Sequence, residues 1–403
     1  MKILLLHDYG TATGGAELQM LALRRGLRAR GHDVRLFTSR ATHVGGEVLA
    51  DDSCFGVTNR LQVLTQTYNP SAVRQLRRVL RAFQPDIVHA RMILYQLSPA
   101  ILPLLSSYPA IYQAAMYRAI CPLGTRVLPD GSDCTHIAGR VCLKERCLTP
   151  QSWLMLMMQR MLWQRGHRVF SRYVALSHVM RETLETGGLS PVMVIHNGVP
   201  ERAMRAPLSG PPRVVYAGRL AREKGVDLLL RAFAATRRAV PTATLDIIGD
   251  GPLRESLGRT VDALQLTSSV RFRGHLTREQ MEAECDSAWV QVVPSQWHEP
   301  FGNVSTEAMM RGTAVVASDV GGQRDIVRHD ETGLLVPARD EVAWTHAMTS
   351  LLTDRELAER YGAAGRARAL ARFSERACLD QWEALYREVI AERGRASALA
   401  EQA

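Results

Sequence analysis

Short apolar runs alternate with amphipathic segments along the whole chain. This alternation is typical of parallel α/β layers, because each buried strand is followed by a helix that covers the sheet. The Met- and Leu-rich helix expected at residues 153–164 suits either a buried position or a membrane surface. In the first half, the pattern predicts strands at residues 3–6, 34–38, 87–90 and 192–195, and helices at 16–30, 71–83 and 153–164.

The alternation restarts after residues 200–212, a stretch rich in Pro, Gly and Arg that lacks periodicity. Such a stretch is typical of an interdomain linker. One long helix is expected at residues 374–392, with Phe373, Trp382 and Leu385 as candidate packing positions. Strands are expected at residues 214–217, 245–248, 270–272, 290–293, 314–317 and 334–336.

A chain of 403 residues exceeds the size at which one core usually stops growing, so two domains are expected. We predict an α/β fold of two Rossmann-like, doubly wound domains, residues 1–198 and residues 199–375, that meet across a cleft. The C-terminal helix, residues 376–403, is expected to pack back on the first domain. Ligands of such sheets bind at the carboxyl ends of the strands.

Composition and charge narrow the possible partners. Hydrophobic residues at 46% and charged residues at 22% are typical of a globular protein. The sequence has no run of eighteen apolar residues, so no transmembrane helix is predicted. The apolar start is too short for a signal peptide, so we expect a cytoplasmic protein. A net charge of +10 without a nucleic-acid motif favours anionic nucleotide sugars or an anionic membrane face over nucleic acid. A solvated basic surface explains the charge equally well.

Two acidic residues, Glu299 and Glu307, stand eight residues apart, with Pro300 and Gly302 between them. Pro and Gly both disfavour a helix interior, so a helix is expected to begin near Asn303. Glu299 then projects from a loop and Glu307 from the first turns of the helix. The amino end of that helix is an anion site. Two acids that bind hydroxyl groups, on either side of a phosphate site, indicate one ligand, a nucleotide diphosphate sugar.

Two other loops at predicted strand ends carry residues suited to phosphate. Gly14 and Gly15 open the first helix, where paired glycines let a ligand approach the backbone. They lack the Gly-x-Gly-x-x-Gly spacing of a dinucleotide fingerprint, which argues against an oxidoreductase. Arg219 and Lys224 follow the strand at residues 214–217, and a planar donor fork beside a compact charge suits a diphosphate.

Taken together, these segments resemble the retaining nucleotide-sugar glycosyltransferases of glycosyltransferase family 4, which have the two-domain GT-B architecture. The segments span nearly the whole chain in the family order. They are Gly14-Gly15-Ala16-Glu17, Gly218-Arg219-Leu220 with Lys224-Gly225, Glu299-Pro300-Phe301-Gly302, Glu307-Ala308 and Asp319-Val320-Gly321-Gly322.

The resemblance implies a role for each matching position. Arg219 and Lys224 would bind the donor diphosphate and stabilise the leaving group. Glu299 would contact hydroxyl groups of the donor sugar, and Glu307 those of the ribose. Backbone N–H groups near the donor would come from Phe301, Gly302 and Asn303, with Gly14 and Gly15 under the diphosphate.

The resemblance also implies a reaction. Transfer would retain the anomeric configuration, through front-face attack in which the leaving phosphate takes the acceptor proton. The family needs no metal for transfer, in agreement with the lack of an Asp-x-Asp motif in this sequence.

One position departs from the family pattern. The family commonly has two histidines in the loop where this chain has His89 and Arg91. His89 is therefore carried over as a candidate catalytic residue on weaker grounds than the others. Arg91 is interpreted either as a contact to an acidic sugar or acceptor, or as the partner of a local carboxylate.

Four of the seven cysteines lie in an aperiodic stretch, residues 118–150. In a reducing compartment, four thiols in one loop favour a tetrahedral zinc site over disulfides, although close Cys-x-x-Cys pairs are missing. Independent buried thiols, disulfides and an iron–sulfur cluster are the alternatives. The loop would shape acceptor choice in the amino-terminal domain. The candidate zinc ligands are Cys121, Cys134, Cys142 and Cys147, with His136 as an alternate.

The function expected from these features is transfer of a sugar to a hydroxyl acceptor, in cell-surface polysaccharide or glycolipid biosynthesis. The acceptor would be a sugar, a lipid-linked molecule or a small molecule. The alternatives are a natural-product glycosyltransferase, a GT-B sugar-nucleotide epimerase or phosphorylase, and a sugar-nucleotide-binding protein without activity. Intact Arg219, Lys224, Glu299 and Glu307 argue against the last of these.

Overall fold

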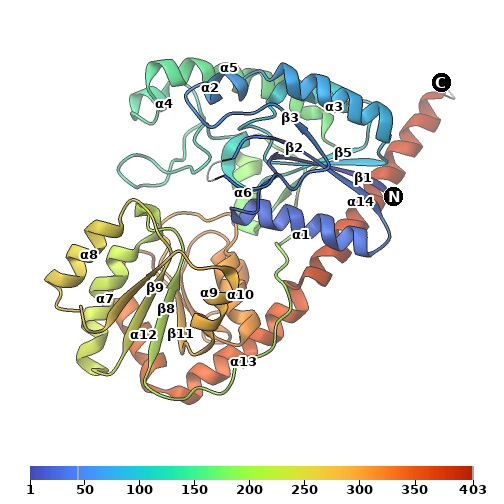
Figure 1. Ribbon diagram of the computed structural model, residues 1–403. Helices are drawn as coiled ribbons and strands as arrows, with labels where there is room; N and C mark the ends of the chain where they lie inside the picture. Colours follow the sequence, from blue (N-terminus) through green and yellow to red (C-terminus); the bar gives the residue numbers. More distant parts are fainter. Residues whose placement is uncertain (43–44, 402–403) are drawn as a thin grey trace. The chain divides into compact units, whose positions relative to one another are not determined.

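The computed structural model describes residues 1–42 and 45–401, which divide into two compact units (Figure 1). Unit 1 comprises residues 1–198 and the C-terminal segment that begins at Glu375, and unit 2 comprises Val199–Ser374. Each unit is built on one parallel sheet with helices on both faces. Among the described residues, none of the helices has the length and apolar character needed to cross a bilayer.

The sheet of unit 1 has the strand order β3-β2-β1-β4-β5-β6-β7. Its central strand β1 pairs in parallel with β2 on one side and with β4 on the other. Strands β3, β5 and β6 were not among the strands expected from the apolar runs. The strands are β1 (Lys2–Tyr9), β2 (Asp33–Ser39), β3 (Asp52–Cys54), β4 (Ile87–Arg91), β5 (Ala110–Gln113), β6 (Arg172–Ala175) and β7 (Val192–Val194).

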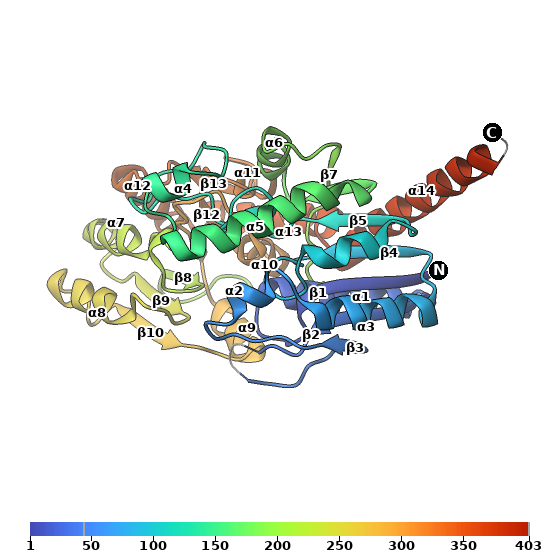
Figure 2. The same ribbon diagram turned by 90° about the horizontal axis from the view of Figure 1, so that it is seen from above.

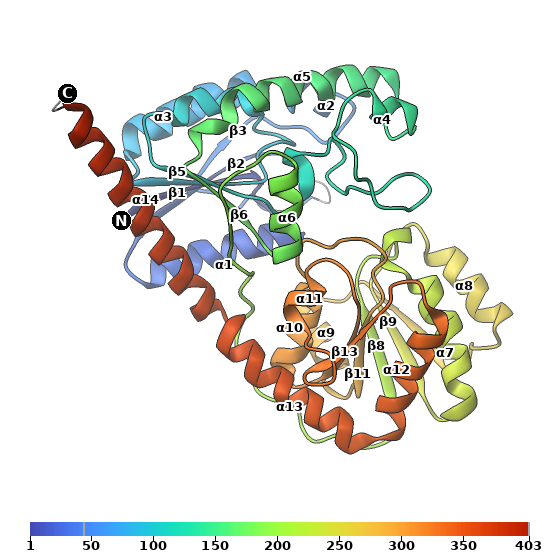
Figure 3. The same ribbon diagram turned by 180° about the vertical axis from the view of Figure 1, so that it is seen from behind.

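Helices cover both faces of this sheet (Figures 1 and 3). Helix α1 (Gly15–Ala29) buries Met20, Leu23 and Leu27, one stripe at helical spacing, and lies beside α14 (Glu375–Glu401). The other face carries α3 (Pro70–Phe83) and α5 (Pro150–Gly166). The shorter helices are α2 (Gln62–Thr65), α4 (Val141–Lys144) and α6 (His178–Thr186), with 3-10 turns η1 (Pro99–Leu105), η2 (Tyr117–Ala119) and η3 (His167–Val169).

The C-terminal helix contributes to the core of unit 1, although the rest of that core precedes residue 199. The expected packing positions Trp382 and Leu385 are both buried, together with Tyr386. The hydroxyl of Tyr386 lies 2.7 Å from Nδ1 of the buried His89, and the Trp382 ring lies 4.4 Å from the His89 ring. Helix α14 is therefore attached to β4 by apolar packing and by a polar contact.

The sheet of unit 2 has the strand order β10-β9-β8-β11-β12-β13, again with parallel pairing throughout. All six strands lie where the apolar runs predict them. Residues 200–212 have no regular secondary structure, as expected, but Arg205 within them is buried and paired with Glu359 of the same unit. The strands are β8 (Arg213–Ala217), β9 (Thr244–Ile248), β10 (Val270–Gly274), β11 (Val290–Val293), β12 (Ala314–Ser318) and β13 (Gly333–Val336).

Two layers of helices enclose the sheet of unit 2. Alternate residues of β8, such as Val214 and Tyr216, face the core that α7 and α12 complete, and Val215 and Ala217 face the opposite cluster. Helix α10 begins at Asn303, as predicted, and packs against α13. The helices are α7 (Val226–Ala239), α8 (Arg254–Ala263), α9 (Arg278–Asp286), α10 (Asn303–Arg311), α11 (Gln323–Ile326), α12 (Glu341–Thr353) and α13 (Arg355–Arg372), with η4 (Arg222–Lys224).

Candidate active site

The candidate donor residues of unit 2 lie at the point where the strand order reverses. Strands β8 and β11 are neighbours in the sheet, and the chain leaves them toward opposite edges. In doubly wound sheets the loops at such a point diverge and leave a crevice at the carboxyl ends of the strands. Arg219 and Lys224 follow β8, and Glu299 follows β11. The topology thus places three of the predicted residues on neighbouring loops.

Close backbone contacts hold these loops together. The N–H of Gln296, after β11, donates to Glu223 O, after β8, at 2.8 Å. A Cβ atom on Gly225 would lie 2.1 Å from Pro294 O, so only glycine permits this approach between the loops after β8 and β11. The position of Lys224 relative to Glu299 is therefore determined by the backbone.

Glu299 is the centre of a hydrogen-bond network. Its side chain is almost fully buried, forms an ion pair with Lys224, and accepts hydrogen bonds from Ser295 Oγ at 2.8 Å and Gln323 Nε2 at 3.2 Å. Burial alone would raise the pKa of this carboxyl group, but the Lys224 ammonium and the other donors hold the pKa below its usual value. Glu299 is therefore ionised at neutral pH and fixed in one orientation.

The two predicted cations differ in their surroundings. Lys224 is half-buried, and besides the ion pair its ammonium lies 5.7 Å from the centre of the Trp297 ring. The Arg219 side chain is exposed, and within the described residues it forms no ion pair or side-chain hydrogen bond. Arg219 therefore offers a positive charge that no described residue neutralises.

Glu307 and the residues around it occupy the first turns of α10. Burial raises the pKa of Glu307, against the attraction of Arg311 and Arg278, and its carboxylate lies 3.9 Å from the Arg278 guanidinium. Phe301 is buried, with its ring 5.8 Å from that of Phe373. Phe301 thereby anchors the chain just before the amino end of α10, which is formed by Gly302 and Asn303.

In unit 1, the loop after β1 leads to the amino end of α1. Gly14 is the residue before the helix and Gly15 is its first residue, as the sequence predicts. The carboxylate of Glu17 folds back over this end, because a Cβ atom on Gly14 would lie 2.2 Å from Glu17 Oε2. A negative group thus already lies at the positive end of the helix.

The structure places His89 among packed side chains. His89 is fully buried; its Nδ1 contacts Tyr386 and its Nε2 lies 3.1 Å from Gln113 Oε1. Burial and the nearby Arg91 lower the pKa of His89 to about 3, so the ring is neutral at physiological pH. Arg91 ends the same strand and is also buried.

The four clustered cysteines come from separate parts of residues 118–150. Each is half-buried with a free thiol: Cys121 follows η2, Cys134 closes a small hairpin, Cys142 lies in α4, and Cys147 precedes α5. Burial and the other three thiols raise the pKa of Cys147, so the four groups are close enough to interact electrostatically. Within the described residues, however, no three of these sulfur atoms lie within 4.8 Å of one another.

Sequence reasoning did not single out several partners of the site. Ser295 and Gln323 both bind Glu299, and Ser305 Oγ donates to Gln323 Oε1 at 2.7 Å. Asp8, at the end of β1, accepts three backbone hydrogen bonds from residues 95–97 and so shapes the loop after β4. The sequence feature that could have identified Asp8 and Gln323 is their position after a predicted strand. Asp8 follows the apolar run of the first strand, and Gln323 directly follows Gly321-Gly322.

Comparison with known families covers both units. The family described as Glycosyltransferase Family 4 matches residues 13–202, and the family described as Glycosyl transferases group 1 matches residues 201–368. The chain belongs to glycosyltransferase family 4. It is a glycosyltransferase that uses nucleotide-sugar donors. The family and the enzyme class expected from the sequence are thus confirmed.

Two curated relatives illustrate the range of the family. Glycogen synthase of Mycobacterium tuberculosis is 28% identical to this chain over 388 residues, which cover 89% of this chain and 87% of the synthase. The GDP-mannose-dependent alpha-(1-6)-phosphatidylinositol monomannoside mannosyltransferase of the same organism is 35% identical over 161 residues, which cover 38% of this chain and 42% of that protein.

Solved structures establish the fold. Sucrose-phosphate synthase from Thermosynechococcus elongatus superimposes with a TM-score of 0.74 at 22% identity, covering 97% of this chain and 100% of that one. HepE of Anabaena, in complex with UDP and glucose, gives a TM-score of 0.68 at 19% identity, with 96% and 100% covered. The glycosyltransferase therefore has the predicted GT-B fold.

Gly321 tests whether the position of Glu299 controls donor binding. At a φ of +54°, a Cβ atom there would lie 2.5 Å from Glu299 O and 2.6 Å from Glu299 N, so Gly321→Ala must displace the Glu299 backbone. We expect affinity for the nucleotide-sugar donor to fall at least about tenfold, measured by calorimetry, because buried Glu299 contacts have little room to adjust.

Gly274→Ala is the matched control. Gly274 has a similar φ of +67° but open space around its Cβ position. Gly274→Ala should lose about 1–2 kcal/mol of unfolding free energy for the left-handed backbone, measured with urea. Gly321→Ala should lose more, because it also displaces the Glu299 backbone. Equal donor affinities in the two variants would contradict the role given to Glu299.

Proposed function

We propose that this glycosyltransferase transfers a sugar from a nucleoside diphosphate to a hydroxyl acceptor with retention of configuration, in the synthesis of a cell-surface polysaccharide or glycolipid. The observation that supports this most is the Glu299 network beside Arg219 and Lys224 at the strand-order reversal of unit 2. A fixed carboxylate suits sugar hydroxyl groups, and neighbouring cations suit a diphosphate.

In this proposal, Arg219 and Lys224 stabilise the negative charge that develops on the departing diphosphate. Glu299 orients the sugar, since its carboxylate is already ionised and held by Ser295 and Gln323. Glu307 binds the ribose hydroxyl groups, and the amino end of α10 binds donor phosphate. The buried His89 serves as a positioning residue for Gln113.

The relatives support a sugar polymer or a glycolipid as the product. The two mycobacterial proteins are named for glycogen synthesis and for mannosylation of a phosphatidylinositol mannoside. A kanosaminyltransferase of Streptomyces kanamyceticus, 33% identical over 178 residues, keeps a small-molecule acceptor as the second candidate. None of these three relatives is named as an epimerase or a phosphorylase.

A donor screen tests the proposed function. Ligand binding to the folded state raises the unfolding temperature, so UDP-, GDP- and ADP-sugars are compared in thermal unfolding of the full chain. We expect one base to stabilise the protein and its sugar to be transferred only when an acceptor is present, with the anomer read by NMR. Epimerisation of the free nucleotide sugar, or an inverted product, would contradict the proposal.

Two variants separate the roles of the acidic residues. Glu307→Gln should weaken binding of the free nucleoside diphosphate about tenfold, whereas Glu299→Gln should leave that affinity nearly unchanged and lower kcat about 100-fold, as expected when a group that orients the transferred sugar is lost. Glu341→Gln, at a half-exposed acid on α12, is the control. Equal effects on nucleotide affinity in the two variants would overturn the assignment.

We also propose peripheral contact with an anionic membrane through the α2–α5 face of unit 1. This face combines exposed apolar side chains with the adjacent α3 arginines, the composition that interfacial segments need. Figure 2 shows the ribbons of helices α2, α3 and α5 in unit 1. Helices α2 and α5 are joined where Gln159 Nε2 donates to Gln66 O. The apolar members are Leu61, Leu64, Tyr68, Leu154, Met158 and Met161, and the basic members are Arg74, Arg77, Arg78 and Arg81.

Vesicle sedimentation tests this contact. The protein should sediment with phosphatidylglycerol vesicles and much less with phosphatidylcholine vesicles, and added salt should weaken the binding. Each arginine near an anionic surface contributes about 1 kcal/mol, so Arg77→Gln with Arg78→Gln should lower the vesicle affinity about tenfold or more. Arg259→Gln on α8 of unit 2 should have no effect. Equal binding to both vesicles would remove the membrane proposal.

A structural zinc ion remains our proposal for the cysteine cluster. Its support is the proximity of four free, half-buried thiols in one long loop. Thiolates are the preferred ligands of structural zinc, and the loop must draw the sulfur atoms closer to reach ligand distance.

Metal analysis of the purified protein should give about one zinc per chain, with four fewer titratable thiols before chelation than after it. Cys378→Ser is the control, because Cys378 lies outside the cluster, where its thiol donates to His196 O at 3.3 Å. Absence of metal together with four reactive thiols would exclude zinc.

A further inference from the structure

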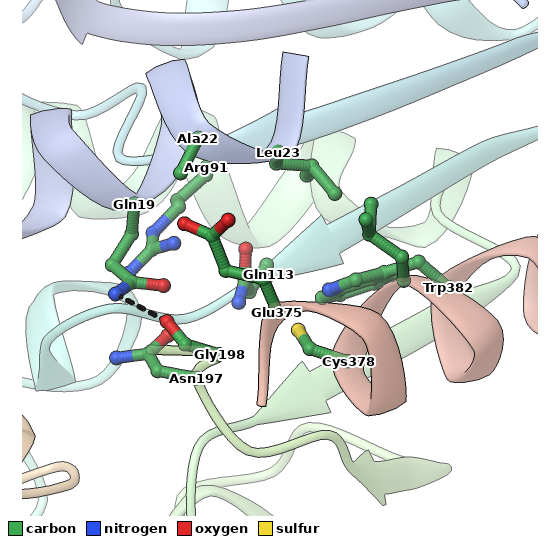
Figure 4. Close-up of a pocket in the computed structure, with 11 residues that line it drawn as sticks. Gln19, Ala22, Leu23, Arg91, Gln113, Asn197, Gly198, Glu375, Cys378 and Trp382 are labelled. Atoms are coloured by element: carbon green, nitrogen blue, oxygen red, sulfur yellow. Dashed lines mark hydrogen bonds between the residues drawn. The ribbon is translucent and has the colours of Figure 1, made fainter. Parts of the chain in front are cut away.

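A small cavity lies in unit 1 at the carboxyl end of β4 (Figure 4). Residues from α1, β4, β5, the loop after β7 and the start of α14 line it. Its volume of about 20 Å³ has room for a water-sized group, but not for a sugar ring. The polar lining residues are Gln19, Arg91, Gln113, Asn197 and Glu375.

Arg91 is the unusual member of this lining. It is 3% exposed, and within the described residues its guanidinium has no ion pair and no side-chain hydrogen bond. Its Nε atom is completely buried without an acceptor. A buried charge without partners is strongly destabilising. Figure 4 shows the guanidinium turned toward the same space as the side chains of Gln19 and Glu375.

The two nearby acidic residues do not pair with the Arg91 guanidinium. Glu375 accepts two hydrogen bonds from Arg25, at 3.0 and 3.3 Å. Glu17 attracts Arg91, but its carboxylate is folded over Gly14 at the end of α1. Burial lowers the pKa of Arg91 to about 10 in spite of Glu17, and the group still carries its charge at neutral pH. The cavity thus has a positive charge without a matched anion.

A chain of contacts prepares a second donor in the cavity. Tyr386 OH donates to His89 Nδ1 in the tautomer whose Nε2–H donates to Gln113 Oε1. The Gln113 amide oxygen is then occupied, which leaves its NH2 group as the part available to a ligand. Gln19 is fixed in a similar way, since its Nε2 donates to Gly198 O at 2.9 Å.

We propose that the Arg91 cavity binds one anionic oxygen group of the sugar acceptor, a carboxylate or a phosphoryl group. The cavity has room for one oxygen atom of that group, and this oxygen can accept hydrogen bonds from the Arg91 guanidinium and from the Gln113 amide. The inference rests on the proposed function only in assigning the group to the acceptor. Arg91 would then make the glycosyltransferase select acidic over neutral acceptors.

Direct binding to the full chain, without donor, tests the cavity. Calorimetry compares glucuronate, glucose 6-phosphate, inorganic phosphate and glucose. We expect the carboxylate or the phosphate sugar to bind at least about tenfold more tightly than glucose, and the tighter of the two identifies the group. If neither binds more tightly than glucose, the proposal is wrong whatever the variants do. Tight binding of inorganic phosphate alone would also overturn it, because the acceptor would not be involved.

Variants of Arg91 separate ligand binding from a structural role. Arg91→Gln should lose the preference for the anion while its unfolding temperature stays the same or rises, because a buried unpaired charge is removed. Arg91→Lys should keep part of the preference, since it keeps the charge without the fork. Arg168→Gln, at an exposed arginine of η3, should match the wild type. If Arg91→Gln is less stable than the wild type, and neither protein prefers the anionic sugars to glucose, Arg91 serves only to balance the charges of Glu17 and Glu375.

Nucleotide binding keeps this test distinct from that of the proposed function. The nucleoside diphosphate that stabilises the wild type should stabilise Arg91→Gln equally. If nucleotide binds and the acidic sugars do not, the cavity proposal fails alone. If no nucleotide binds the wild type, the proposed function fails, whereas the anion result still reports on the cavity.

Discussion

The buried carboxylate of Glu299 is the interaction on which the arrangement of loops in unit 2 depends. Lys224 reaches it from the loop after β8, Ser295 from its own loop, and Gln323 from the residues after β12. Because a buried charge without partners is strongly destabilising, loss of Lys224 or Gln323 would weaken the attachment of a second loop as well as remove a hydrogen bond. Together with the backbone contacts between the loops, this one side chain therefore holds three strand ends in their relative positions.

Sheet topology brings these partners together from distant parts of the chain. Lys224 lies 75 residues before Glu299, and Gln323 lies 24 residues after it. Parallel strands end at the same edge, and the order β8-β11-β12 makes their loops neighbours. Unit 1 follows the same rule, since β1 and β4 are adjacent and deliver Gly14 and Arg91.

The sequence predicted the elements of this site better than their contacts. Pro300 and Gly302 are local signals, so the loop position of Glu299 and the start of α10 at Asn303 were predictable. The pairing of Lys224 with Glu299 was not, because it depends on a contact across the sheet. His89 shows the same limit. Its position at a strand end suggested a site residue, but packing against α14, almost 300 residues later, encloses its ring.

The contrast between Glu299 and Arg91 is informative about ligands. Both are buried charged groups at strand ends, but every oxygen of Glu299 has a protein donor, whereas the Arg91 guanidinium has no acceptor among the described residues. A satisfied charge needs no ligand for its stability and can act as a fixed surface for sugar hydroxyl groups. A buried charge without a partner destabilises the fold until an anion binds to it. A hydrophobic residue at position 91 would be more stable, so the arginine is expected to persist only if it binds an anion. The second kind of residue is therefore the better indicator of what this chain recognises.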